Sequence, residues 1–296
     1  MSESKSSMGE HAPAISIGMP VYNGAKYIRE ALDSLLAQTF ADFELVISDN
    51  ASTDATQLIC EEYARLDPRI RYVRQQENKG AVANFRFVLE EARADLFMWA
   101  AYDDLWSQDY LMDTKTLLED KSIDFVFPTF ELRSIQLRIA KKFDPEIFRF
   151  IESTDRRWRV LHFISLHYLS HSANIVYSLF RSDFLRAAWA TQDIGNDGVL
   201  GALVSSRGRG AVSHALFSKR YRLNWPGMVP AVVSIANGWL HGRDVTGETR
   251  QAIQAARLRM LGLFPEHQHE ITFIFERYRP YSHDRHYRAC SIVELF

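Results

Sequence analysis

The chain has 296 residues, of which 47% are hydrophobic, so it can bury a sizeable core without disulfide bonds. Its 35 Lys and Arg against 37 Asp and Glu give a net charge of -2. This charge provides no global field for a nucleic-acid backbone and excludes nucleic acid as the default partner. The two cysteines, Cys60 and Cys290, lie far apart in the sequence, which is typical of a reducing compartment.

Residues 1–13 form a polar leader that lacks the apolar centre of a signal peptide. No later stretch is long and apolar enough to span a bilayer. We therefore expect a cytoplasmic protein whose membrane contact, if there is any, is peripheral at the inner face of the membrane.

Short apolar runs then alternate with segments of helical periodicity. Ile15 to Met19 predicts a strand, and the apolar residues from Ile28 to Leu36 recur at the spacing of a helix. The same unit repeats, with strands predicted at 43–47, 70–73, 96–100 and 123–127 and helices near Asp54, Phe85 and Ser107. This alternation predicts the α/β class, with a doubly wound, mostly parallel sheet flanked by helices.

The rhythm changes after Pro128, and the boundary of the first domain is expected near Thr129. The elements predicted beyond it are a basic loop at 133–145, a helix at 155–169, strands at 174–180 and 211–217, and helices from Asp183 and Asp197. We therefore divide the chain into the leader 1–13, a first domain 14–129, a middle segment 130–224 and a helical C-terminal extension 225–296.

Polar residues follow three of the predicted strands, where ligands bind in an open parallel sheet. They are Asn23 after the first strand, Asp49 and Asn50 after the second, and Asp103 and Asp104 after the fourth. Any one of them could be a helix cap or a turn residue. Paired carboxylates after a buried strand are costly unless a cation neutralises them, and their oxygens suit Mg²⁺ or Mn²⁺ beside a diphosphate.

The sequence lacks two other common signatures of phosphate binding. It has no glycine-rich loop followed by Lys and Ser or Thr, and no dinucleotide fingerprint follows the first strand. These absences argue against a kinase and against a dehydrogenase.

Four segments occur in order at suitable spacing: Pro20 to Asn23, Ser48 to Asp54, Asn78 to Gly80, and Trp99 to Trp106. Together they resemble the family 2 glycosyltransferases of the GT-A fold, over about one domain's length of chain. The resemblance implies an enzyme that uses a nucleotide-diphosphate sugar. Residues 14–129 would bind this donor, and residues 130–224 would bind the acceptor and supply the catalytic base.

The resemblance also implies roles for individual residues. The donor would be bound by Pro20, Tyr22, Asn23, Asp49, Asn50, Asn78, Lys79 and Asp103, and Mg²⁺ or Mn²⁺ by Asp104 and Asp103. The chain departs from the family pattern twice. Tyr102 stands where the acidic triplet often begins with Asp, so the metal site depends on Asp103 and Asp104. Asn50 stands where many members have a second Asp, a change that concerns the contact to the base.

Family 2 enzymes generally invert the anomeric centre in one displacement, which requires a base that deprotonates the acceptor hydroxyl. We assign Asp197, because it opens an apolar helix that ends at Arg207, with Asp193 as the alternative. Either aspartate could instead be a simple helix N-cap.

The leading hypothesis is therefore a metal-dependent, inverting transfer to a glycan or lipid-linked acceptor, in the synthesis of a cell-surface polysaccharide or glycolipid. A nucleotidyltransferase could use a similar sheet and acidic metal site, although the sequence lacks the glycine-rich loop expected near the first strand. A catalytically silent nucleotide-sugar-binding module is the other alternative, suggested by Tyr102. The sugar, the nucleotide and the acceptor depend on loop positions that the sequence does not reveal.

Overall fold

The computed structural model describes residues 12–134, 139–142, 145–156, 159, 163, 172–189 and 197–221. Contacts divide the chain into two compact units, Met1–Tyr221 and Arg222–Phe296, and every described residue belongs to the first. The helical extension predicted at 225–296 lies outside the described residues, as does most of the helix predicted at 155–169.

The first half of the described chain alternates strands and helices. Its elements are β1 (Ile15–Val21), α1 (Ile28–Leu36), β2 (Phe43–Asp49), α2 (Thr56–Leu66), β3 (Ile70–Arg74), α3 (Ala81–Glu90) and β4 (Leu96–Trp99). The strands pair in the order β3-β2-β1-β4, and all three pairings are parallel. This arrangement confirms the predicted α/β class.

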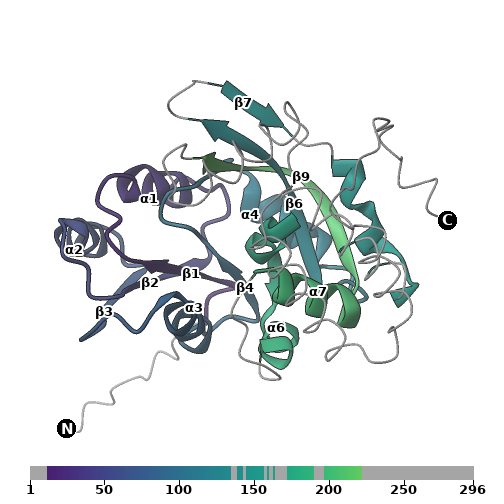
Figure 1. Cartoon of the computed structure of the whole chain (residues 1–296), viewed down its shortest axis with the longest axis horizontal. Coiled ribbons are helices and arrows are strands. Elements are labelled where there is room, and N and C mark those ends of the chain that lie inside the picture. Colours follow the sequence, from purple (N-terminus) through teal and green to yellow (C-terminus); the bar gives the residue numbers. More distant parts are fainter. Residues whose placement is uncertain are drawn as a thin grey trace, which may run out of the picture. The chain divides into compact units, whose positions relative to one another are not determined.

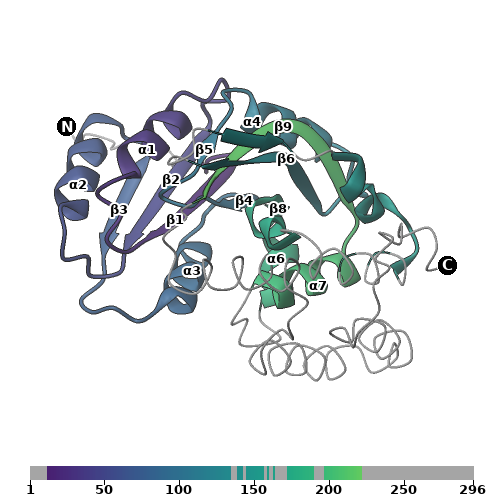
Figure 2. The same ribbon diagram turned by 45° about the horizontal axis from the view of Figure 1, so that its top comes forward.

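Helices cover both faces of this parallel part of the sheet. The chain moves outward from β1 to β3 and then returns to β4, so right-handed connections place α1 and α2 on one face and α3 on the other (Figure 2). The strands β1 and β2 are buried on both faces, because every one of their residues is buried. This is why their sequences are nearly continuous apolar runs.

The second half extends the same sheet. Its elements are β5 (Leu105–Trp106), α4 (Tyr110–Leu117), β6 (Phe125–Ser134), β7 (Ile139–Lys142), the 3₁₀ helices η1 (Pro145–Glu152) and η2 (Ser172–Tyr177), β8 (Leu179–Arg181), α6 (Ser182–Trp189), α7 (Asp197–Arg207) and β9 (Gly210–Tyr221). The strand order continues β4-β8-β6-β9-β5, and β7 pairs with β6 (Figure 1). In the described part beyond β4 only β6 and β9 pair in parallel, so the sheet is mixed there.

An aromatic core joins the two halves through β4, β8 and β6. The ring of Phe180 on β8 lies 6.3 Å from Trp99 of β4 and 5.8 Å from Phe125 of β6, measured between ring centroids. All three side chains are fully buried. Aromatic side chains of this size contribute most of the burial in a core, so the parallel and mixed parts of the sheet share one hydrophobic interior.

Two predicted elements differ in the structure. The loop expected at 133–145 contains the end of β6 and the strand β7, where Glu131 lies directly opposite Lys142. The basic residues Arg133 and Lys142, which suggested a loop, lie on these strands, and Glu131 provides the opposite charge on β6. The strand expected at 174–180 begins only at Leu179, after η2. A short apolar run does not distinguish a buried strand from a buried helix.

The boundary of the first domain, expected near Thr129, falls inside the strand β6 (Phe125–Ser134).

Candidate active site

The loop after β1 is held by the loop after β2. The backbone N–H of Asn23 donates to the Ser52 hydroxyl at 2.9 Å, and the Asn23 Oδ1 accepts the backbone N–H of Thr53 at 2.8 Å. The backbone N–H of Gly24 donates to the Thr56 hydroxyl at 2.8 Å. Asn23 has a φ of 51°, in the left-handed region that Asn adopts more readily than most residues. Two of the predicted segments therefore meet at the carboxyl ends of their strands.

Two other predicted residues of the first segment differ in exposure. Pro20 is buried within β1, where it lies opposite Ser48 of β2. Tyr22 follows the end of β1 and exposes 43% of its surface. Of these two side chains, Tyr22 is the one available to a ligand at this edge of the sheet.

Asp49 ends β2 with a carboxylate that is fully buried. Its Oδ2 accepts hydrogen bonds from the Tyr72 hydroxyl at 2.8 Å and from the Arg74 guanidinium at 2.9 Å, and its Oδ1 accepts the backbone N–H of Ser52 at 2.8 Å. Arg74 therefore balances the charge of Asp49 inside the protein. Burial, followed by the hydrogen bond to Asp49, raises the pKa of Tyr72.

Sequence reasoning missed Tyr72 and Arg74. Residues two apart on a strand point to the same face, so the sequence places Tyr72 and Arg74 on one face of β3 without indicating which side chain lies opposite them. The parallel register then places Arg74 directly opposite Asp49.

The third predicted segment joins the second through Asn50. The side chain of Asn50 is 3% exposed and contacts Asn78 and the backbone of Lys79 and Gly80. The predicted residues from these two segments therefore lie together.

The fourth predicted segment contains the acidic pair. Asp104 is 2% exposed, and its Oδ1 accepts the backbone N–H of Arg220 at 2.8 Å. Burial raises the pKa of the Asp104 carboxyl to about 7, and the negative charge of Asp103 acts in the same direction, whereas Lys219 opposes it. The pairing of Leu105 in β5 with β9 brings these residues together.

Arg220 also connects this turn to α1. Its guanidinium pairs with Glu30 and lies 5.4 Å from the centre of the Tyr27 ring. No local pattern in the sequence indicates that Arg220 and Lys219 lie beside Asp104, because β9 is far from the acidic turn along the chain.

Asp103 and Asp104 fit a divalent cation. They supply hard carboxylate oxygens, and because burial and the charge of Asp103 raise the pKa of Asp104, a nearby cation would favour its charged form. Among the described residues no group of three or more His, Cys, Asp or Glu side chains could hold a metal. Mg²⁺ typically uses one or two carboxylates together with substrate phosphates and water, so the pair is sufficient for a cation that a diphosphate shares.

Tyr102 connects the fourth segment to the first. A Cβ atom on Gly24 would lie 2.8 Å from Cδ2 of the Tyr102 ring and 2.6 Å from the Val21 side chain. The ring therefore packs against Gly24, and only glycine leaves room for this contact. At the position where a carboxylate was expected, an aromatic ring joins the loops that follow β1 and β4.

The two candidates for the base are described only in part. The helix α7 begins at Asp197 and ends at Arg207, as the sequence predicts. The side chain of Asp197 and the whole of Asp193 lie outside the described residues. Their catalytic roles therefore stay predictions.

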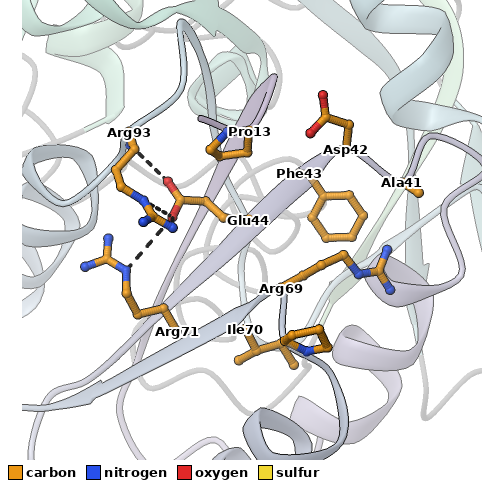
Figure 3. Close-up of a pocket in the computed structure, with 10 residues that line it drawn as sticks. Pro13, Ala41, Asp42, Phe43, Glu44, Arg69, Ile70, Arg71 and Arg93 are labelled. Carbon is orange, nitrogen blue, oxygen red and sulfur yellow. Dashed lines mark hydrogen bonds and ion pairs between the residues drawn. The ribbon is translucent and has the colours of Figure 1, made fainter. Parts of the chain in front are cut away.

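A shallow cavity of about 480 Å³ lies at the opposite, amino-terminal ends of β1, β2 and β3 (Figure 3). The buried carboxylate of Glu44 lies there, 2.9 Å from Arg93 and 3.9 Å from Arg71, and Arg69 pairs with Asp67 at 2.7 Å. Arg71 also pairs with Glu91, so three carboxylates compensate these three arginines and the cavity is a poor site for a diphosphate.

In the part of the chain that the structure describes, no helix has the length and apolar character needed to cross a membrane.

Comparison with protein families identifies residues 16–182, more than half of the chain, as a match to the model described as glycosyl transferase family 2. TuaG of Bacillus subtilis, assigned to teichuronic acid biosynthesis, is 32% identical over 120 residues, which cover 40% of this chain and 48% of TuaG. EpsH of the same organism is 39% identical over 98 residues, 33% of this chain and 28% of EpsH. The chain thus spans less than half the length of these relatives.

Solved structures share the fold at low sequence identity. The mannosyltransferase PcManGT of Pyrobaculum calidifontis, in complex with GDP-Man and Mn²⁺, has a TM-score of 0.52 and 15% identity, over 90% of this chain and 86% of that one. TarS 1-349 of S. aureus, in complex with UDP, has a TM-score of 0.52 and 19% identity, and the match covers 71% of this chain and 61% of that one. These likenesses confirm the GT-A-like fold.

Proposed function

The chain belongs to glycosyl transferase family 2, and on this premise we propose that it transfers a sugar from a nucleotide-diphosphate sugar to a glycan or lipid-linked acceptor. One observation supports the proposal above the others. Four separate segments of the sequence meet at the carboxyl ends of the parallel strands, with the acidic pair Asp103 and Asp104, of which Asp104 is buried, at that edge. Ligands of open α/β sheets bind at this edge.

The proposed donor site uses residues from all four segments: Pro20, Tyr22, Asn23, Asp49, Asn50, Asn78, Lys79 and Asp103. Within this set the described contacts separate two kinds of side chain. Tyr22 and Lys79 are exposed and available to a ligand, whereas Asp49 and Asn50 are buried and hold the loops. The donor would therefore contact the exposed side chains of Tyr22 and Lys79, while the buried side chains of Asp49 and Asn50 hold the loops in place.

Asp104 and Asp103 would hold Mg²⁺ or Mn²⁺. A bound cation would supply positive charge to the diphosphate that leaves the sugar. The neighbour PcManGT was solved with GDP-Man and Mn²⁺, which supports this assignment. The role of the chain is to orient Asp104 through the backbone N–H of Arg220 and to place Lys219 within electrostatic reach of the acidic pair.

We assign the acceptor-activating base to Asp197, at the start of α7, with Asp193 as the alternative. A carboxylate there would accept the proton of the acceptor hydroxyl as that oxygen attacks the sugar, and a single displacement of this kind inverts the anomeric centre. TuaG and GlyA of Streptococcus pneumoniae are named glycosyltransferases, the former in teichuronic acid biosynthesis, which supports a role in making a cell-surface polysaccharide or glycolipid.

The test is to measure the release of nucleoside diphosphate from a panel of UDP, GDP, CDP and dTDP sugars with Mn²⁺ and mixed glycan acceptors. We expect release with one of the nucleotides, and loss of release in the Asp104→Ala variant that keeps its fold. Pyrophosphate exchange without sugar transfer would instead indicate a nucleotidyltransferase. Tight nucleotide binding without any turnover would indicate a silent binding module.

A further inference from the structure

One buried carboxamide holds the exposed segment Asn78–Gly80. The Asn50 Nδ2 donates to the Asn78 Oδ1 at 2.8 Å and to the Gly80 carbonyl at 3.2 Å, while the Asn50 Oδ1 accepts the backbone N–H of Lys79 at 2.9 Å. All three residues of the segment are exposed, whereas Asn50 is buried. The buried side chain of Asn50 thus forms a hydrogen bond with each residue of the exposed segment.

These bonds require an amide at position 50. The backbone N–H of Lys79 can only donate, and the carbonyl of Gly80 can only accept, so both ends of the Asn50 side chain have a defined partner. Both N–H bonds of its amide are in use. An aspartate has the same shape but no donor, and it would place a carboxylate oxygen against two acceptors.

The segment presents positive charge at the start of a helix. Lys79 precedes Gly80, the N-cap residue of α3, where the macrodipole of the helix is also positive. The first turn of α3 contains no acidic residue, and its N-cap residue is a glycine, which has no side chain to cap the helix. The charge of Lys79 and the positive end of the helix dipole repel each other in the free protein. Together they favour an anionic ligand at this end of α3.

The backbone at Gly80 also depends on this anchor. Its φ of 84° lies in the left-handed region, and nothing lies within 4 Å of the place where its Cβ would be. Because glycine has no side chain and the space beside its Cα is open, side-chain packing does not hold the turn at this position. Its conformation is maintained by the Asn50 amide and by the Asn78 side chain, which accepts the Gly80 N–H at 2.9 Å.

We propose that Asn50 is a positioning residue that holds Lys79 and the start of α3 toward the diphosphate of the donor, and that it does not itself contact the nucleotide. The identity of the ligand rests on the proposed function. The hydrogen bonds from Asn50 to the segment do not depend on that function, so the two can be tested separately.

The experiment uses the chain of 296 residues, three single variants, and two double variants that combine Lys79→Met with the Asn50 substitution or with the control. Asn50→Asp keeps the shape of the side chain and removes both donated hydrogen bonds. Lys79→Met removes the exposed charge and keeps the backbone N–H that Asn50 accepts. Gln38→Glu is the matched control, because Gln38 is also buried and its Nε2 donates to the Ser107 carbonyl at 2.7 Å, with no hydrogen bond to residues 78–80. Asn50→Ala replaces Asn50→Asp if the aspartate variant does not fold.

Two measurements are made on each variant. Hydrogen exchange of the peptide that contains residues 78–80 is followed without ligand, and the affinities for UDP, GDP, CDP and dTDP are measured with Mn²⁺. We expect Asn50→Asp to accelerate exchange in this peptide and to weaken nucleotide binding roughly tenfold, the size of a loss of one or two hydrogen bonds. In the Lys79→Met background the same substitution should weaken binding much less, because its effect passes through Lys79.

The outcomes separate the two proposals. Unchanged exchange at residues 78–80 in the Asn50 variant would overturn the positioning role, whatever the protein binds. Equal losses of affinity from Asn50→Asp with and without Lys79 would overturn the claim that Asn50 acts through Lys79, and so would the same coupling from Gln38→Glu. A wild-type chain that binds none of the four nucleotides would overturn the proposed function, while the exchange data would still decide the role of Asn50.

Discussion

The Oδ1 atom of Asp104 lies 2.8 Å from the backbone nitrogen of Arg220, a residue 116 positions further along the chain. Asp104 is thereby oriented by a backbone group that no substitution except proline removes. The guanidinium of Arg220 pairs with Glu30 of α1, so the acidic turn, the last described strand and the first helix are joined at one point.

The first prediction concerns the metal. Asp104→Asn should abolish Mn²⁺-dependent donor binding and lower turnover by about a hundredfold or more, because several kcal/mol of charge stabilisation are lost. The fold should be retained, since an asparagine oxygen can still accept the Arg220 N–H. Calorimetry with Mn²⁺ and nucleoside diphosphate, together with steady-state kinetics, checks both effects. Asp113→Asn, an exposed carboxylate of α4, is the control. Full turnover in excess chelator would contradict the metal assignment.

A further prediction for Asp104→Asn concerns how the free energy of unfolding depends on pH. Because the pKa of Asp104 is raised from 3.8 to about 7, the folded state retains a proton that the unfolded state loses between these values. This contribution to stability is complete below pH 4 and is lost as the pH rises through 7. Metal-free Asp104→Asn should therefore gain stability over the wild type between pH 4 and 8, by up to about 4 kcal/mol. Urea unfolding across this range measures the difference in the free energy of unfolding. Added Mn²⁺ should make the wild type the more stable of the two proteins.

A second prediction concerns Asp49. Asp49→Asn should raise the donor KM more than it lowers kcat, because the loop that it holds binds ground state and transition state about equally. Tyr72→Phe removes one donor to the same carboxylate and should have a smaller effect in the same direction. Steady-state kinetics with varied donor tests both variants. A collapse of kcat at unchanged donor KM would show that Asp49 acts in the chemical step.

A third prediction concerns Glu44, away from the proposed donor site. Burial would raise the pKa of this carboxyl, but hydrogen bonds from Ser16 and Arg93 outweigh burial and hold the pKa below its usual 4.5. Its contribution to stability is therefore present above about pH 4.5 and is lost as the pH falls through the lower folded-state pKa. Glu44→Gln should destabilise the protein by about 1–3 kcal/mol at pH 7 and by less at pH 3.

The control for this measurement is Glu62→Gln, which removes an ion pair with Arg29 in which both side chains are exposed. Exposed ion pairs contribute little to stability, so this variant should unfold like the wild type. A Glu44 variant whose stability loss does not change between pH 7 and pH 3 would argue against the ion-pair network as the cause.

The last prediction concerns the base. Asp197→Asn should lower kcat by about a hundredfold or more and leave donor affinity nearly intact, because a general base acts only in the transition state. Asparagine keeps most of the capping ability, so a purely structural role predicts near-normal turnover. Asp193→Asn in the same assay is the comparison. If it is inactive but binds donor while Asp197→Asn turns over normally, the base is Asp193.

Much of the first half of the fold follows from the sequence. The apolar runs that became β1, β2 and β4 and the helical periodicity of α1 are local patterns, and the residues after each strand then lie at the ligand edge. The element at 174–180 was less predictable. A buried 3₁₀ helix and a buried strand use the same apolar residues, and only packing decides between them.

By itself, the sequence determined the α/β class, the parallel half of the sheet and the four segments at its carboxyl edge, because each depends on neighbours along the chain. Tertiary structure alone decided that Tyr72 and Arg74 hold Asp49 and that Arg220 holds Asp104. These contacts join residues 23, 25 and 116 positions apart. Strand register and the path of β9 create them, and neither has a local pattern that specifies which distant side chain satisfies a buried charge.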